Sequence, residues 1–320
     1  MLRLIAIAVI LSVFVIPAAA FAQESVAGTI NGQVINGTEG GSITAGVEIT
    51  LLTYVNDALA GTMTTRTDEE GRFQFDVAST EHTYLVSARY REVDYYYLVV
   101  FEPGETVTYI EVGVCDTTTS DEAIRVGLAH AIISVEEESI QVSQVYWLVN
   151  DEDRTYVGTD HVLVFTLPDG AYGFNAPQEL MLDYQLLDDN KVTYLVPFPP
   201  GERQLIFSYK LAKPDSNDLG IPLAIDYPTN SFELMVGGED IEVIVGQLAP
   251  AEPVLADTGE RFIHFQGSGF ARGNVINVAI SGLLAARSLP YVILSVIITA
   301  VAVIIVVYMV RRTKRVARDE

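Results

Sequence analysis

Residues 67–77, Thr-Asp-Glu-Glu-Gly-Arg-Phe-Gln-Phe-Asp-Val, contain a turn followed by a β-strand. From Arg72 onward, polar and apolar residues alternate, which is typical of a strand with one face on a core and the other in water. Asp68 can cap the turn with its side chain, and Gly71 can adopt the positive φ that a tight turn needs. The stretch therefore predicts a β-hairpin in an all-β domain.

The same kind of pattern continues on both sides of this hairpin. Short runs rich in Val, Ile, Tyr, Phe and Thr recur, and Gly, Asp, Asn or Pro residues separate them. Examples are residues 47–51, 83–89, 95–101 and 106–112. Sustained helical periodicity is scarce between residues 24 and 280, so we expect strands packed as an antiparallel β-sandwich.

Three motifs in the first third of the chain resemble a known family. Residues 28–34 read GTINGQV, residues 46–51 read GVEITL, and residues 67–75 read TDEEGRFQF. The pattern is similar to that of carboxypeptidase regulatory-like domains, which are transthyretin-like β-sandwiches. The resemblance covers roughly residues 24–113. It implies a fold and an accessory, binding or spacer role; it does not imply peptidase activity, because such domains accompany peptidases without carrying the zinc site.

A second β region follows a polar, Thr-rich bridge. The predicted order outside the membrane is a first sandwich domain at residues 23–114, a linker at 115–122 and a second, Ig- or transthyretin-like sandwich domain at 123–287. Within the second domain we expect strands that include residues 123–135, 139–149, 179–187 and 204–211. The three glutamates of residues 136–138 are interpreted as a solvated turn.

The N-terminus has the pattern of a secretory signal peptide. A basic start at Arg3 precedes an apolar run at residues 4–16, and Ala20-Phe21-Ala22 supplies a cleavage pattern. We predict a signal peptide at residues 1–22. The alternative is an uncleaved anchor, but the apolar run is short for a membrane span.

The C-terminus has the pattern of a membrane span. Residues 288–310 contain no charged side chain, and at 1.5 Å per residue a helix of about 20 residues crosses the hydrocarbon core. The basic tail at residues 311–320 marks the cytoplasmic side. A cell-wall sorting signal would need an LPxTG-like motif, which the sequence around Pro290 does not supply. The sequence therefore predicts one transmembrane helix with the preceding region outside the cell membrane.

The charge of the outer region excludes one class of partner. The whole chain has a formal net charge of -23, and its acidic residues lie almost entirely between the two apolar ends. Such a region repels nucleic acid, which is a polyanion. Cys115 is the only cysteine, so an intrachain disulfide and a multi-cysteine metal site are both impossible.

Metal and cofactor motifs are weak. The four histidines are scattered and form no HExxH pattern. Calcium is the least implausible ion, because Asp151 and Asp153 belong to an acidic segment that we expect at a hairpin tip, but an EF-hand would need a glycine where Tyr156 stands. The main hypothesis is therefore that the chain carries no metal site and no cofactor.

Catalytic motifs are also missing. No G-x-S-x-G elbow and no glycine-rich phosphate loop are present. Paired carboxylates of a glycosidase cannot be recognised in a sequence with 42 acidic residues. We therefore predict that the protein is not an enzyme.

The run Tyr95-Tyr96-Tyr97 is the most distinctive candidate for ligand contact. In a strand, Tyr95 and Tyr97 face one side and Tyr96 faces the other, so at least one ring can meet a glycan or protein partner. The alternative is that these rings only cover the sandwich. The favoured function is a membrane-anchored binding module at the cell surface; the alternatives are an accessory subunit of a membrane complex and a glycan-active ectoenzyme.

Overall fold

The computed structural model describes residues 27–42, 44–256, 259 and 261–284. The predicted signal peptide, membrane helix and basic tail lie outside these residues. In the described part of the chain, no helix has the length and apolar character that crossing a membrane requires. Contacts divide the chain into two compact units. Of the described residues, unit 1 contains 27–35, 44–89 and 94–112, and unit 2 contains the remainder.

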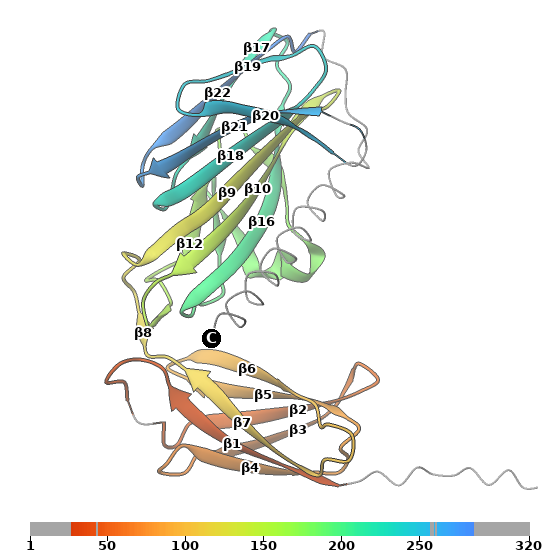
Figure 1. Cartoon of the computed structure of the whole chain (residues 1–320), viewed down its shortest axis with the longest axis vertical. Coiled ribbons are helices and arrows are strands. Elements are labelled where there is room, and N and C mark those ends of the chain that lie inside the picture. Colours follow the sequence, from red (N-terminus) through yellow and green to blue (C-terminus); the bar gives the residue numbers. More distant parts are fainter. Residues whose placement is uncertain (1–26, 43, 257–258, 260, 285–320) are drawn as a thin grey trace, which may run out of the picture. The chain divides into compact units, whose positions relative to one another are not determined.

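The described chain is nearly all β-strand, as the sequence predicts (Figure 1). The first seven strands are β1 (Gly28–Asn36), β2 (Glu48–Val55), β3 (Ala58–Arg66), β4 (Arg72–Val77), β5 (Thr83–Tyr90), β6 (Val93–Val99) and β7 (Val107–Val114). The others are β8 (Thr117–Thr118), β9 (Ile124–Val135), β10 (Ser139–Asn150), β11 (Thr155–Tyr156), β12 (Leu163–Thr166), β13 (Tyr172–Asn175), β14 (Tyr184–Leu187), β15 (Lys191–Tyr194), β16 (Gly201–Ala212), β17 (Asp218–Ala224), β18 (Thr229–Gly237), β19 (Glu242–Val245), β20 (Ala249–Leu255), β21 (Arg261–Phe270) and β22 (Val275–Ser281). A 3-10 helix, η1 (Gln178–Asp183), precedes β14.

Unit 1 is a sandwich of two sheets. One sheet has the strand order β4-β1-β7, and the other has the order β3-β2-β5-β6. Strands β1 and β4 are antiparallel. Strands β1 and β7 run in the same direction, because Thr29 N donates to Thr106 O at one end of the pair and Gly37 N donates to Val114 O at the other.

Alternation along these strands builds the core of unit 1. In β4, Phe73, Phe75 and Val77 are buried while the residues between them are exposed. Ile49 and Leu51 of β2 point inward in the same way. Each strand thus buries one face and leaves the other to solvent, as a two-layer sandwich requires.

Unit 2 is built on a seven-stranded sheet with the order β13-β16-β10-β9-β18-β21-β20. Two three-stranded sheets, β12-β15-β14 and β17-β22-β19, share one apolar core with it. Phe165, Tyr146 and Phe207 stack in this core, with ring centroids 4.8 Å apart for the first two. The central sheet is mixed, because β9 and β18 are parallel and the other pairs are antiparallel.

Two predictions for unit 2 are wrong in detail. Residues 179–187 were expected to form one strand, but the first part is η1 and only Tyr184–Leu187 is extended. Glu136 was expected in a solvated turn, but it is buried, where it accepts hydrogen bonds from Lys210 Nζ at 2.9 Å and Ser139 Oγ at 2.6 Å. Burial of a charge is tolerated there because the carboxylate has a cationic partner.

Candidate functional site

The predicted contact tyrosines lie on β6, which ends the strand order of the four-stranded sheet of unit 1. Val93 and Val99 are buried, so the odd-numbered positions of β6 face the core. Tyr95 accordingly is half-buried, while Tyr97 remains 42% exposed at the sheet edge. Tyr96 points to the opposite, outward side, which agrees with the alternation expected of a strand.

The outward side of the second half of β6, together with the residue that follows it, is apolar. Tyr96, Leu98 and Val100 are 63%, 62% and 60% exposed. Leu52 of β2 and Leu85 of β5 pair with each other across the same sheet and are half-buried on its outward face. We call these five residues the tyrosine face. The positions of a strand that face solvent are normally polar, so this group of apolar side chains departs from the pattern of a solvated sheet.

Charged residues on the same outward surface are paired. Arg66 and Glu48 form an ion pair at 3.2 Å, and Arg89 and Asp94 form another at 3.1 Å. All four side chains are more than one-third exposed, so these pairs contribute little to stability. Of the two pairs, Arg89–Asp94 links β5 to β6, so the charge of Asp94 is neutralised on the strand that carries Tyr96.

The two weak calcium candidates, Asp151 and Asp153, both form ion pairs with arginines. Both oxygens of Asp151 accept hydrogen bonds from Arg125, and Arg154 lies 3.9 Å from Asp153. The expected hairpin tip is not formed, because β11 pairs with β8 rather than with β10. Among the residues that the structure describes, no group of three His, Cys, Asp or Glu side chains is arranged to hold a metal ion.

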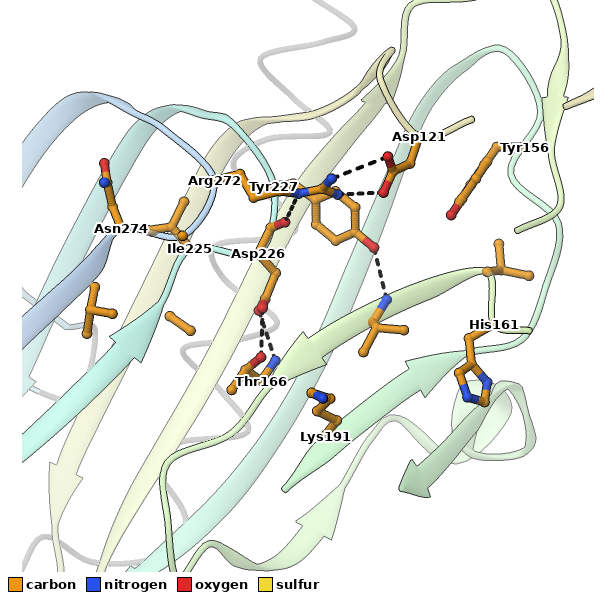
Figure 2. A pocket seen from close by; sticks show the side chains of 15 residues that line it. Asp121, Tyr156, His161, Thr166, Lys191, Ile225, Asp226, Tyr227, Arg272 and Asn274 are labelled. Carbon is orange, nitrogen blue, oxygen red and sulfur yellow. Dashed lines mark hydrogen bonds and ion pairs between the residues drawn. The ribbon is translucent and has the colours of Figure 1, made fainter. Parts of the chain in front are cut away.

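A groove of about 460 Å³ lies within unit 2 (Figure 2). We call it the Arg272 groove. Its lining comes from segments far apart in the sequence: Asp121 before β9, Thr166 at the end of β12, Asp226 and Tyr227 between β17 and β18, and Arg272 between β21 and β22.

Arg272 is the central residue of this groove. Its two terminal nitrogens donate to the Asp121 carboxylate at 3.3 and 2.6 Å, and its Nε donates to the carbonyl oxygen of Asp226 at 2.7 Å. Figure 2 shows the guanidinium against the Tyr227 ring, whose centroid is 5.0 Å away. The hydrogen bonds to Asp121 raise the pKa of Arg272 above its ordinary value. This geometry ties three loops together through one side chain.

Several other polar groups of the groove are also engaged. The Asp226 carboxylate accepts hydrogen bonds from the backbone nitrogen and the hydroxyl of Thr166 at 2.9 and 2.7 Å. The Tyr227 hydroxyl accepts one from Val164 N at 3.0 Å, and burial raises the pKa of this hydroxyl. Lys191 pairs with Asp189 at 2.8 Å. These contacts connect loops of unit 2 to one another, so we interpret the Arg272 groove as a feature that stabilises the fold.

A second polar cluster lies on the seven-stranded sheet. Glu233 of β18 has His130 of β9 on one side at 3.3 Å and His264 of β21 on the other at 3.7 Å. The ring of His130 meets the Trp147 ring edge to face at 5.0 Å. Burial lowers the pKa of His130, although the Glu233 carboxylate acts in the opposite direction. The histidine therefore stays neutral in the folded protein at neutral pH.

Sequence reasoning missed both of these groups. Asp121 was assigned to a linker, Arg272 was given no role, and nothing in their spacing indicates that they meet. His130 and His264 were interpreted only as two of four scattered histidines. Their approach to Glu233 depends on the parallel pairing of β9 with β18, which no local sequence signal specifies.

Comparison with known proteins identifies no family. No family model matches the chain, and no curated protein matches it. Among solved structures, similarity extends to the major pilin SpaD of Corynebacterium diphtheriae, with 12% identity, 78% of this chain and 81% of the pilin covered, and a TM-score of 0.22. A DUF3823 family protein from Parabacteroides merdae has 10% identity, 62% and 90% coverage, and a TM-score of 0.22.

A two-domain M1 zinc metallopeptidase bound to L-tryptophan has 8% identity and a TM-score of 0.32, with 51% of this chain covered. The match spans only 44% of that metallopeptidase, and 41% of a further match from Parabacteroides distasonis.

Proposed function

We propose that this chain is a membrane-anchored, extracytoplasmic binding protein. In this proposal, residues 1–22 direct export, residues 288–310 form the single span, and residues 311–320 remain in the cytoplasm. Units 1 and 2 then lie outside the membrane, where their surfaces meet a protein or glycan partner. No cofactor, metal ion or catalytic residue has a part in this function.

The tyrosine face is the observation that supports binding. Single apolar residues on a surface are ordinary, but contiguous apolar groups mark contact surfaces. Tyr96 and Leu98 are each mostly exposed on the outward side of β6, and Val100, which directly follows the strand, is mostly exposed as well. Covering a large apolar side chain contributes about 1.5–3 kcal/mol, so a partner that covers all three gains substantial affinity.

Site-specific photocrosslinking in the native membrane tests this proposal. A benzoylphenylalanine residue replaces Tyr96 or Leu98 in the full chain, and the same replacement at the exposed Glu242 of unit 2 is the control. We expect one shared adduct from Tyr96 and Leu98 and none of that mass from Glu242. No adduct at Tyr96 and Leu98, or the same adduct at all three positions, would contradict the proposal.

The accessory-subunit alternative differs in where the contact lies. If the membrane span makes the contact, an unrelated apolar helix in place of residues 288–310 abolishes the adduct at Tyr96. If the tyrosine face makes it, that replacement leaves the adduct in place and the double change Tyr96→Ala with Leu98→Ala weakens partner recovery by at least about tenfold.

A further inference from the structure

The three-stranded sheet of unit 1 carries a second surface with binding character. A groove of about 500 Å³ is lined by residues of β1, β3, β4 and β7. Asn31 lies opposite Gln74 in the pairing of β1 with β4, and Gln33 lies opposite Arg72. Tyr109 of β7 reaches the same surface, because its hydroxyl donates a hydrogen bond to Gln33 Oε1 at 3.2 Å. We call these five residues the amide face.

The ring of Tyr109 is fixed in place yet open to solvent. Its hydroxyl is held by Gln33, and Gln33 Nε2 in turn donates to the carbonyl oxygen of Glu70 at 2.8 Å. The residue nevertheless remains 58% exposed. Because the hydroxyl is used internally, the aromatic surface is what Tyr109 offers to a ligand. A fixed ring loses little conformational entropy on binding.

The backbone under this surface is also rigid. Gly32 faces inward, and a side-chain carbon added there would lie 2.2 Å from Phe73 Cζ. The Phe73 ring therefore packs directly on the β1 backbone, and it meets Phe75 edge to face at 6.0 Å. This packing holds β1 against β4 and keeps the outward side chains of both strands in register.

The charges around the groove are neutralised within unit 1. Arg72 contacts Asp68 at 3.0 Å and Glu70 at 2.7 Å, and Arg66 contacts Glu48 at 3.2 Å. An anionic ligand would thus meet arginines already surrounded by carboxylates, in a chain of strong negative charge. The arrangement favours a neutral ligand.

Several hydrogen-bonding groups of the amide face remain available. In the part of the chain that the structure describes, the Asn31 side chain makes no hydrogen bond. Gln74 donates to Asp76 Oδ1 at 3.1 Å through its Nε2, which leaves its carbonyl oxygen as an acceptor. An amide group can donate and accept hydrogen bonds, as a sugar hydroxyl can. Each amide side chain can therefore either donate a hydrogen bond to a sugar hydroxyl or accept one from it.

We propose that the amide face binds a neutral glycan. The sugar ring lies with its C–H side on Tyr109, where the negative face of the aromatic ring attracts it, while Asn31 and Gln74 hydrogen-bond its hydroxyls. This inference shares only the extracytoplasmic location with the proposed function, because the tyrosine face belongs to the other sheet of unit 1.

A peptide fits this surface less well. Peptides that bind β-sandwiches commonly add a strand to a sheet edge and place side chains in apolar pockets. The amide face instead lies on the outward surface of the sheet, and its groove is lined mainly by polar side chains. Peptide binding is therefore kept as an outcome that the experiment can reveal.

Titration of the purified full chain with defined oligosaccharides tests the inference. The probes are maltotetraose, cellotetraose and the tetramer of N-acetylglucosamine, with tetragalacturonate as the anionic comparison and an unstructured Gly/Ser peptide as a competitor. We expect at least one neutral probe to bind by calorimetry and by saturation-transfer NMR. Binding should weaken about tenfold in Tyr109→Ala and in Asn31→Ala, since each removes one principal contact.

Two matched variants keep the result interpretable. Val107 is exposed on the same strand as Tyr109 but does not line the groove, so Val107→Ala should leave affinity unchanged. Tyr109→Phe keeps the ring and loses only the bond to Gln33, so it should retain affinity within about threefold. If Tyr109→Phe binds and Tyr109→Ala does not, the loss of affinity comes from the missing ring.

Three results would overturn the inference: no neutral probe binds, Tyr109→Ala binds as the unaltered chain does, or the peptide or tetragalacturonate binds in preference to every neutral probe. The photocrosslinking at Tyr96 is measured on the same preparation. An adduct at Tyr96 without glycan binding rejects this inference and leaves the proposed function standing. Glycan binding without an adduct rejects the proposed contact at the tyrosine face and supports this inference.

Discussion

Glu233 is flanked by two imidazoles because three neighbouring strands place their side chains on the same side of one sheet. His130 comes from β9 and His264 from β21. His264 Nδ1 lies 3.1 Å from the carbonyl oxygen of Glu252, which favours the tautomer with the proton on Nδ1. A protonated His130 would have to remain charged in a buried site, and this explains the direction of its pKa shift.

The lowered pKa of His130 predicts a pH-dependent stability of unit 2. In the unfolded chain the histidine takes up a proton below about pH 6.5, whereas the folded protein resists doing so. The free energy of unfolding should therefore be unaffected by His130 above that pH. It should fall as the pH drops further, with a slope of at most about 1.4 kcal/mol per pH unit for one proton.

Urea unfolding followed by Trp147 fluorescence measures this effect, because Trp147 is the only tryptophan and lies in unit 2. His130→Gln cannot titrate and should have a shallower pH dependence between pH 6.5 and the folded pKa. Parallel curves for the variant and the unaltered chain would show that His130 does not carry the dependence.

At this scale, the sequence predicted single side chains well and partnerships poorly. Alternation alone predicted that Tyr96 faces the side of its strand opposite to Tyr95 and Tyr97, although it did not say which side is outward. The contact of Arg272 with Asp121 could not be predicted in this way, because the two residues lie in loops 151 residues apart in the sequence. A residue's direction is local information, whereas its partner is set by topology.

The turn before β4 is the element that the sequence defined best. Asp68 Oδ1 accepts hydrogen bonds from Glu70 N at 3.0 Å and from Arg72 N at 2.7 Å, which confirms the predicted cap. Gly71 has a φ of 79°, which confirms the predicted positive value. A short polar side chain and a glycine at fixed spacing specify this turn without help from distant residues.

Gly71→Ala should therefore destabilise unit 1 by at least about 1–2 kcal/mol, the strain of a side chain in the left-handed region. The added carbon would also lie 2.4 Å from Thr44 Oγ1 and 2.8 Å from Val34 O. Hydrogen exchange of peptides from β1 and β4 in the full chain measures the change.

Gly61→Ala is the matched control in β3. No atom lies within 4 Å of the added carbon, and the backbone there does not need a glycine. We expect unchanged or slightly greater protection, because alanine restricts the unfolded chain. Equal loss of protection in both variants would mean that the turn does not determine the effect.

Three strands that sequence reasoning missed lie at sheet edges. β17 contains Pro222 and β20 contains Pro250 and Pro253, and proline normally argues against a strand. Both strands end their sheets, where a missing N–H costs little. β3 lies at an edge as well, and its residues are too exposed to alternate clearly.

For the whole molecule, the all-β class follows from composition and turn spacing. The strand order inside unit 2 does not, since the sequence shows which segments are strands but not which are neighbours. The membrane anchor remains a prediction, because residues 288–310 lie outside the described chain.

Removal of residues 288–320 should release the protein from the membrane. We expect the full chain to sediment with membranes after alkaline carbonate washing, since an apolar helix of this length inserts stably. The shortened chain should appear in the soluble extracytoplasmic fraction. A leucine-rich replacement of residues 288–310 is the control and should restore sedimentation. Full-length protein free of membranes, or a shortened chain that stays bound, would contradict the anchor.

The parallel pairing of β9 with β18 constrains the order in which unit 2 can assemble as the chain is synthesised. Met235 lies opposite Ile132, and every strand from β10 to β17 lies between these two residues in the chain. The middle of the large sheet cannot close until the segment carrying β18 has been synthesised. All residues of unit 1 precede the end of β7, so unit 1 can fold first. Unit 2 meanwhile remains incompletely folded, and incompletely folded nascent chains are prone to aggregate.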